Sequence, residues 1–518
     1  MDNNNNISSN KRIAKNTILL YLRMLVMMAI GLFTSRVILH ALGATDLGIN
    51  NVIGGLVGMF TFFNGTLASA SQRFITFALG KGDFSELQKT FSLSFAFHAL
   101  LGVFIFLLLE TVGLWFLYNK MVIPADRMNA AFWLLQFSAI SSLVSVTQVP
   151  YDACIIAHEK MNIYAYFSIF DVVFKLGNTF LVWWYDGDKL IFFGLLGFLE
   201  GLLMLVIYRT YSIRHFKEAH LKFTWDKVLA KSMLTFSGWN VMGTLAVTLS
   251  SQGLSLLMNT FLGPVVNAAM GICGSINGYV MAFVGNFQTA SNPQITKDYA
   301  DGEWERMNSL VYNTAKFSGY IVLYLAIPII INIHLILKLW LGYGIPQYTA
   351  EFTQIILVQN VIFTMSRPLV TEMHAIGKLK IPSLGNGTVL LLILPVSYVL
   401  LRLGFSPVVV YIANVLPWIF QLFFENWYVN SQIGTSPYPF IRKVVIVVML
   451  IGVCSFIPSY LVSKLIENEW IALVASSLVS TIILSVLIYN YGMSKHIRTI
   501  VVNKIFERLH INYRVQAN

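Results

Sequence analysis

The chain has 518 residues, of which 56% are hydrophobic and only 11% are charged, and its formal net charge is +11. A soluble chain carries about 25% charged residues, because its surface must be hydrated. The composition therefore excludes an ordinary water-soluble enzyme of this length and indicates an all-α integral membrane protein. The basic residues lie beside apolar runs rather than on a soluble face, so the positive charge does not indicate a nucleic-acid partner.

Apolar runs bounded by charges or by Gly and Pro predict fourteen transmembrane helices, since about 20 apolar residues cross a bilayer. The expected spans are 16–41, 46–79, 88–118, 128–157, 162–185, 190–213, 232–261, 265–296, 309–341, 350–376, 381–403, 406–431, 440–463 and 469–492. Residues 1–15 form a polar N-terminal tail, and 214–231 form a basic linker. Residues 493–518 place apolar and basic residues at helical spacing, which predicts an amphipathic tail on the cytoplasmic membrane surface.

The distribution of lysine and arginine predicts the orientation of these spans. If the N-terminus is cytoplasmic, 23 of the 35 basic residues fall on the cytoplasmic side, 5 on the outer side and 7 within spans. Because cytoplasmic loops are enriched in Lys and Arg, we expect both termini to be cytoplasmic.

An internal repeat appears when the chain is shifted on itself by 220 residues. Between 42–82 and 262–302, eleven of 41 positions are identical, and five of these are glycines. The repeat predicts two six-helix halves, 16–213 and 232–431, followed by two extra helices within 440–492. Both halves then have the same orientation around a central cavity, as in transporters built from parallel repeats.

Three stretches carry a resemblance to a known family. They are "LGKGDFSELQKTF" after the second span, "NPQITKDYADGEWERMN" after the eighth, and "IIAHEKMNIYAYFSI" between the fourth and fifth. Together with the two halves, they resemble the multidrug/oligosaccharidyl-lipid/polysaccharide exporter superfamily over residues 12–492. The third stretch is similar to the polysaccharide (Wzx-type) flippase branch.

The resemblance implies a non-enzymatic flippase of the bacterial inner membrane, without a cofactor, in lipopolysaccharide O-antigen or related polysaccharide synthesis. Its cargo would be a polyprenyl-pyrophosphate-linked oligosaccharide, moved by alternating access. Its expected partners are membrane lipids and a glycan polymerase or glycosyltransferases of the same pathway. We expect a monomer. The alternatives are a cation-coupled multidrug exporter of the same superfamily and a membrane-embedded glycosyl- or acyltransferase. The absence of a catalytic constellation on any loop disfavours the transferase.

Charges at bilayer depth are costly and usually face a cavity or a partner. The candidates for a cationic, phosphate-binding lumen are Arg23, Arg36, Arg73, Lys316 and Arg367. Snorkelling to the headgroups is the alternative for Arg36 and Arg73.

Buried acids and helix breaks supply the remaining candidates. Asp171 and Lys175 lie four residues apart and can neutralise each other, and with Glu200 and Glu425 they are candidates for ion coupling. Pro150 and Pro368 occupy matching positions in the two halves and are candidate hinges. The three cysteines and the histidines show no metal-binding spacing, so no metal is expected.

Overall fold

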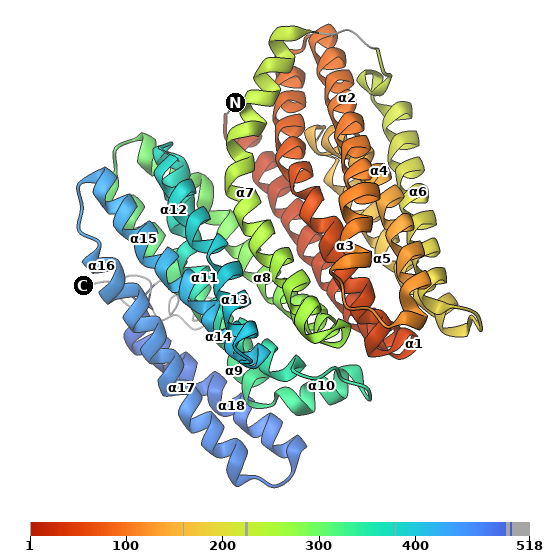
Figure 1. The fold of residues 1–518 in the computed structure, drawn as a ribbon. Coiled ribbons are helices and arrows are strands. Elements are labelled where there is room, and N and C mark those ends of the chain that lie inside the picture. Colours follow the sequence, from red (N-terminus) through yellow and green to blue (C-terminus); the bar gives the residue numbers. More distant parts are fainter. Residues whose placement is uncertain (1, 159, 223–225, 379, 494–497, 500–518) are drawn as a thin grey trace. The chain divides into compact units, whose positions relative to one another are not determined.

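The computed structural model describes residues 2–158, 160–222, 226–378, 380–493 and 498–499, and within them it contains helices and no strands (Figure 1). The helices are α1 (Asp2–Lys81), α2 (Phe84–Leu108), η1 (Leu109–Gly113), α3 (Leu114–Asn119), η2 (Ala125–Arg127), α4 (Met128–Ala157), α5 (Met161–Trp184), α6 (Lys189–His215), η3 (Lys217–Ala219), α7 (Lys227–Leu262), α8 (Pro264–Ala300), α9 (Trp304–Ile331), α10 (Ile333–Leu341), α11 (Thr349–Ile376), α12 (Lys380–Leu391), α13 (Ile393–Arg402), α14 (Pro407–Ala413), α15 (Val415–Ile433), α16 (Tyr438–Phe440), η4 (Ile441–Val445), α17 (Ile446–Leu465), α18 (Glu469–Leu487) and η5 (Ile488–Gly492).

Helix α1 contains the first two predicted spans as one element with a sharp kink at Gly43. Gly43 has φ 77° and ψ 172°, a conformation that residues with a side chain rarely adopt. Five residues later, α1 crosses the start of α8 so closely that a Cβ on Gly48 would lie 1.8 Å from the carbonyl oxygen of Pro264. These two glycines allow α1 to turn and then to pack directly on α8.

Twelve helices among the described residues are long and apolar enough to cross a membrane. The predicted count of fourteen is therefore not confirmed. Two predicted spans account for the difference: the second, 46–79, begins within the α1 segment Met24–Phe60 and is not counted separately, and the tenth, α11, is not among the twelve. Polar residues such as Gln354, Asn360 and Glu372 lower the hydropathy of α11.

The chain divides into two compact units, each assembled from separate stretches of sequence. Unit 1 consists of Met1–Ile272, Lys338–Thr349 and Ser383–Val410, and unit 2 of Cys273–Leu337, Ala350–Pro382 and Tyr411–Asn518. The predicted division into sequence-continuous halves 16–213 and 232–431 stays a prediction.

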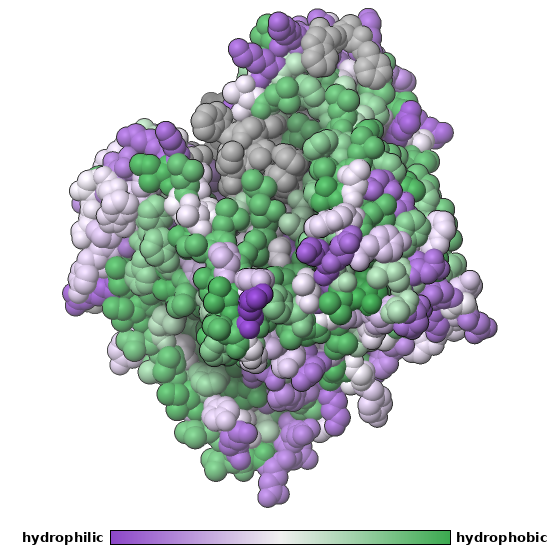
Figure 2. Space-filling model, in the orientation of Figure 1, coloured by the Kyte–Doolittle hydropathy of each residue, from purple (hydrophilic) through white to green (hydrophobic). Residues whose placement is uncertain are grey.

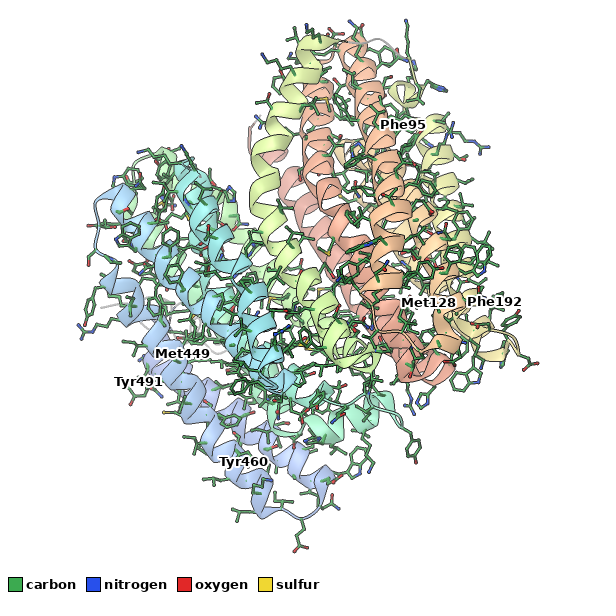
Figure 3. The ribbon with its side chains drawn as sticks, viewed as in Figure 1. Phe95, Met128, Phe192, Met449, Tyr460 and Tyr491 are labelled. Atoms are coloured by element: carbon green, nitrogen blue, oxygen red, sulfur yellow. The ribbon has the colours of Figure 1, made fainter. Side chains whose placement is uncertain are left out.

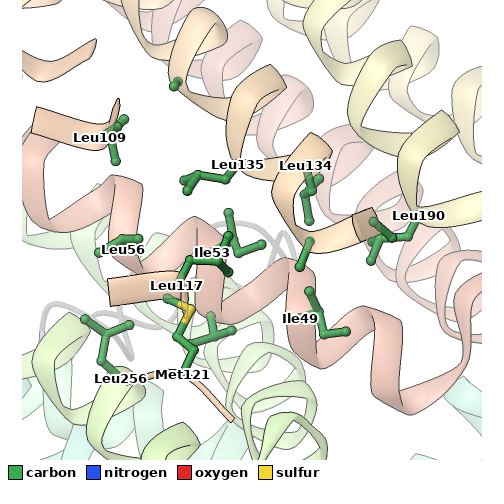
Figure 4. Packing of buried hydrophobic residues seen from close by; sticks show 14 of the residues in the cluster. Ile49, Ile53, Leu56, Leu109, Leu117, Met121, Leu134, Leu135, Leu190 and Leu256 are labelled. Carbon is green, nitrogen blue, oxygen red and sulfur yellow. The ribbon is translucent and has the colours of Figure 1, made fainter. Parts of the chain in front are cut away.

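In unit 1, α4 packs against α1, α2 and α6, and α1 also packs against α5 and α7. Apolar side chains fill this junction, among them Ile49 and Ile53 of α1, Leu135 of α4 and Leu117 of α3, all fully buried (Figure 4). Lipid tails are as apolar as these side chains, so the junction is held by close van der Waals packing. The packing fixes the helix faces that surround the cavity described below.

In unit 2, α9 packs against the hairpin of α17 and α18. Ser455 and Ser459 of α17 and Ser476 and Ser480 of α18 are buried, and such small residues let helices approach closely in membranes. On the outer face of this hairpin, Met449 and Tyr460 are exposed, as is Tyr491 of η5 (Figure 3).

The helix flanks that Figure 2 displays are largely hydrophobic, and hydrophilic residues gather near helix ends. Large aromatic residues lie exposed at several of those ends, including Trp115 in the short helix α3, Trp184 at the end of α5 and Trp470 at the start of α18. All three belong to the side predicted to be outside, and Trp is enriched where a membrane meets water. The surface is that of a multi-pass membrane protein.

Candidate functional site

An open cavity of about 900 Å³ lies within unit 1, lined by residues of α1, α4, α5 and α6. Its polar lining residues are Thr34, Asn50, Ser138, Ser141, Ser142, Ser145, Gln148, Asp152, Tyr164, Ser168, Asp171, Lys175, Asn178, Thr179, Glu200 and Tyr208. Ligand pockets commonly have volumes of about 300–1,000 Å³, and this one is at the upper end of that range. Apolar residues also line the cavity, but a cavity of this size that carries so many polar and charged side chains in a membrane protein indicates a site for a partly polar ligand or for ions.

Helix α4 forms one wall with a row of hydroxyl groups. Ser138, Ser141 and Ser145 are spaced three and four residues apart, so they share one helix face, and Gln148 and Asp152 continue it. The Ser145 hydroxyl donates to the Ser142 carbonyl oxygen at 3.0 Å, which leaves its lone pairs free to accept from a ligand. Gln148 Nε2 lies 3.4 Å from Oδ1 of Asp152.

Helices α5 and α6 form the charged wall. Lys175 Nζ lies 2.7 Å from Oδ2 of Asp171, one turn earlier on α5, and 3.4 Å from Oε1 of Glu200 on α6. The other Glu200 oxygen, Oε2, accepts a hydrogen bond from Asn178 Nδ2 at 3.0 Å. Glu200 is only 6% exposed, and the ammonium group of Lys175 and the amide of Asn178 hold its carboxylate in place. The structure therefore brings together three of the four residues predicted for ion coupling.

The cavity holds three carboxylates and a single ammonium group. With Asp152 on α4 and Asp171 and Glu200 on the opposite wall, Lys175 can compensate only part of the negative charge. Such an arrangement suits a proton, a monovalent cation or a ligand rich in hydroxyl groups. It does not suit a phosphate group.

The predicted cations of unit 1 lie elsewhere. The side chain of Arg23 is outside the described residues. Arg36 is exposed, and its Nη1 donates to the Leu339 carbonyl oxygen at 3.3 Å, at the carboxyl end of α10. A cation is favourable there because the last carbonyl groups of a helix have no partner within it. Arg73 is exposed on α1. Neither Arg36 nor Arg73 lines the cavity.

Two neighbours of Arg36 hold the same segment to α1. Trp340 Nε1 donates to the Leu32 carbonyl oxygen at 2.6 Å, and His40 Nε2 lies 2.6 Å from the Leu341 carbonyl oxygen. Arg36 therefore has a structural partner within unit 1, and a role in the lumen stays a prediction.

The predicted residues of unit 2 do not form one cluster. Lys316 is half-buried, and its Nζ donates to the Gly492 carbonyl oxygen at 3.2 Å. Arg367 is exposed, and its guanidinium lies 5.6 Å from the ring centre of Phe363. Glu425 is fully buried and accepts hydrogen bonds from Ser366 and from Gln421 Nε2, the latter at 2.8 Å.

The two candidate hinge prolines lie inside continuous helices. Pro150 is buried in α4 and Pro368 in α11, and neither helix ends at its proline. Proline removes one backbone hydrogen bond, so both positions remain predicted sites of bending.

Sequence reasoning missed Asp152 and Glu372. Asp152 follows Ser138, Ser141, Ser145 and Gln148 at helical spacing, so a polar stripe within an apolar span was the available signal. Glu372 is 1% exposed on α11, and its Oε1 has no hydrogen-bond partner among the described residues. No comparable pattern in the sequence distinguishes Glu372 from a residue at a helix end.

Comparisons with known proteins agree with this architecture. The sequence model of the MatE family matches residues 241–399. An inward-facing multidrug resistance MATE family transporter of the MOP superfamily is similar in structure, with a TM-score of 0.67, 14% identity, and coverage of 80% of this chain and 94% of that one. The lipid II flippase MurJ, in an inward closed conformation, is similar with a TM-score of 0.67, 13% identity, and coverage of 95% and 100%.

A MOP superfamily transporter from Pyrococcus furiosus is similar with a TM-score of 0.60, 12% identity, and coverage of 81% and 96%. A comparison with curated proteins gives no match. The chain therefore has the fold of MOP superfamily transporters, which include drug exporters and a lipid flippase.

Proposed function

We propose that this chain is a flippase that moves a polyprenyl-pyrophosphate-linked oligosaccharide across the bacterial inner membrane by alternating access. The observation that carries the proposal is the cavity of about 900 Å³ inside unit 1, lined by hydroxyl, amide and carboxylate groups. Apolar helix flanks require no such cavity for their own packing, whereas a sugar-bearing cargo does. The fold adds support, since the likeness to a lipid II flippase covers 95% of this chain.

In this proposal, Arg23, Arg367 and Lys316 are the first candidates for contact with the pyrophosphate. Arginine suits this role because its planar guanidinium can donate two parallel hydrogen bonds to phosphate oxygens. Arg367 is exposed on α11, and its guanidinium lies over the face of Phe363. Arg36 and Arg73 are secondary candidates, because both are exposed on α1.

The proposed energy source is the movement of a proton or another monovalent cation through the cluster of Asp171, Lys175 and Glu200. If one carboxylate takes up a proton, Lys175 can shift its contact to the other, because it already lies within 4 Å of both. Glu425 is a second candidate for such a step. Both termini are proposed to be cytoplasmic and the protein to act as a monomer.

One observation favours a different cargo. Three carboxylates against one ammonium group in the cavity also suit a cationic drug, so a cation-coupled multidrug exporter is the second candidate function. The similarity to a multidrug resistance MATE family transporter supports it.

The test of the main proposal is display of the glycan on the surface of cells that lack the native gene. Wild-type protein should restore display, and Arg23→Ala and Arg367→Ala should each reduce it at unchanged protein abundance, measured by immunoblot. Arg402→Ala is the matched control, because Arg402 is exposed and its Nη1 donates only to the Tyr398 hydroxyl at 3.1 Å. Full display with both arginines replaced would contradict a cationic contact with the cargo.

A further inference from the structure

We propose that the cavity of unit 1 binds the sugar portion of the cargo and excludes its pyrophosphate. The inference rests on the proposed function and assigns one part of the substrate to one set of residues. The sugar site consists of the α4 row Ser138, Ser141 and Ser145 with Thr34 of α1 and the carboxylates across the cavity.

Electrostatics excludes phosphate from this cavity. A pyrophosphate brought near Asp152, Asp171 and Glu200 meets three acidic side chains, and each of them that is ionised repels it more strongly in this partly buried site than it would in bulk water. The single cation, Lys175, already contacts Asp171 at 2.7 Å and Glu200 at 3.4 Å. It cannot serve a phosphate without leaving a carboxylate unpaired.

The hydrogen-bonding groups of the cavity match a neutral polyol. A serine hydroxyl that donates to its own helix can still accept, and Ser142 and Ser145 both donate in this way, at 2.7 and 3.0 Å. Ionised carboxylate oxygens only accept hydrogen bonds, so the carboxylates on α5 and α6 require a ligand that donates them. Sugar hydroxyl groups supply donors in number, and they accept from amides as well.

A buried polar atom without a partner marks the α1 side of the cavity. Thr34 Oγ1 is buried and has no hydrogen-bond partner among the described residues, although Thr34 lines the cavity. A buried hydroxyl without a hydrogen-bond partner destabilises the structure that holds it. A ligand that offers a hydroxyl group would satisfy it.

The shape of the site fits a chain of sugars better than a compact ion. From Ser138 to Asp152 the polar face of α4 extends over fourteen residues, about 21 Å at 1.5 Å per residue. Aromatic rings of Tyr164, Phe193, Phe198 and Tyr208 also line the cavity and can pack against the apolar faces of sugar rings. A proton or a metal ion needs neither the length nor the rings.

The experiment is photocrosslinking in cells that lack the native gene and the enzymes that consume the lipid-linked glycan. The full-length protein carries the photoreactive residue p-benzoylphenylalanine in place of Ser141 or, as a second cavity position, Ser145. Two comparison positions are Phe363, whose ring centre lies 5.6 Å from the guanidinium of Arg367, and Val173, an exposed residue on α5 that does not line the cavity. The glycan is radiolabelled, and each variant is checked for abundance and for a monodisperse profile in detergent.

Mild acid then cleaves the bond between sugar and phosphate. Because benzophenone inserts into C–H bonds, an adduct formed through a sugar keeps its label, whereas an adduct formed through the lipid chain loses it. We expect acid-resistant label at Ser141 or Ser145 and acid-sensitive label at Phe363 and Val173. Acid-sensitive label at the comparison positions with none at either cavity position would overturn the sugar site and leave the flippase proposal standing. Absence of label at every position would contradict both.

Discussion

The ammonium group of Lys175 lies 2.7 Å from a carboxylate oxygen of Asp171, one helical turn earlier on α5. The same nitrogen lies 3.4 Å from Glu200 on α6, so one cation joins two helices through two acids. Because Glu200 is buried, its charge depends on Lys175 and on Asn178 for compensation. A change in the protonation of Asp171 or of Glu200 therefore affects the other acid through Lys175, which contacts both.

Replacing Lys175 with Met should therefore destabilise the protein and stop transport. Leaving the buried Glu200 without its cation costs about 1–3 kcal/mol, which should lower the Tm measured by fluorescence-detected size exclusion after heating. Adding Glu200→Gln to Lys175→Met should restore most of the Tm, because no uncompensated charge then remains on α6, but it should not restore transport.

Lys120→Met serves as the control, since Lys120 is exposed and lies over the Trp115 ring. An unchanged Tm for Lys175→Met would show that water or another group compensates Glu200.

A second prediction concerns Arg127, which joins three segments on the side predicted to be outside. Its Nη2 lies 2.6 Å from Oδ2 of Asp46, and its Nη1 lies 2.9 Å from Oδ2 of Asp188. Charge-assisted hydrogen bonds of this kind contribute about 1.5–3 kcal/mol, so Arg127→Ala should lower the Tm clearly. Arg127→Lys should lose less, because it keeps the charge but not the bidentate geometry. Equal Tm values for the two variants would argue against a role for that geometry.

Acid should weaken the contact of Arg127 with Asp188. Burial raises the pKa of Asp188, but hydrogen bonds from Arg127 and from the backbone N–H groups of Ile191 and Leu190 outweigh burial and lower the pKa below the ordinary value. A carboxyl group with a lowered folded-state pKa stabilises fully above its unfolded pKa, near 3.9, and loses that contribution as the pH falls through the folded value.

Acid unfolding below pH 4 should consequently be less steep in Asp188→Asn, in which asparagine still caps α6. Asp126→Asn, at an exposed position beside Arg127, should unfold with the wild-type pH dependence. The measurement is intrinsic fluorescence of the detergent-solubilised protein between pH 2 and pH 6. Identical acid transitions for wild type and Asp188→Asn would contradict the assignment.

The topology prediction follows from the asymmetry of 23 basic residues against 5. Alkaline phosphatase fused after residue 518 should be inactive, because the enzyme needs the periplasm to form its disulfides. The same enzyme inserted between Asp186 and Gly187, in the turn between α5 and α6, should be active. The opposite pattern of activity would invert the orientation of the whole chain.

Much of the helical architecture could be predicted from hydrophobic run length alone. Runs long enough to cross a bilayer predicted most of the helices, and the contact of Asp171 with Lys175 follows from their spacing on one helix. Local periodicity could not predict that Lys175 also reaches Glu200, since this contact depends on how α5 packs against α6. Nor could it predict that Arg36 meets the end of α10, more than 300 residues later in the chain.

The limits of charge-based reasoning appear at Asp152 and Ser141. A search for isolated charges in apolar spans selects basic and acidic residues, although it did not select Asp152, and it passes over serine, which costs little to bury when it donates to its own helix. The cavity is defined by many such weakly polar groups on four helices. Its location depends on the packing of those helices and on no single motif.

The most direct test of the central claim is flipping by the purified full-length chain in sealed vesicles. Vesicles hold a fluorescent polyprenyl-pyrophosphate-linked oligosaccharide in both leaflets, and a glycosidase added outside removes the label it can reach. We predict that the protein exposes label from the inner leaflet, that Arg367→Ala slows this exposure, and that the lipid carrier without its glycan is not moved. The contrary result would be an inner-leaflet pool of label that stays protected from the glycosidase while the same protein transports a quaternary ammonium dye. That result would contradict the flippase and favour the drug exporter.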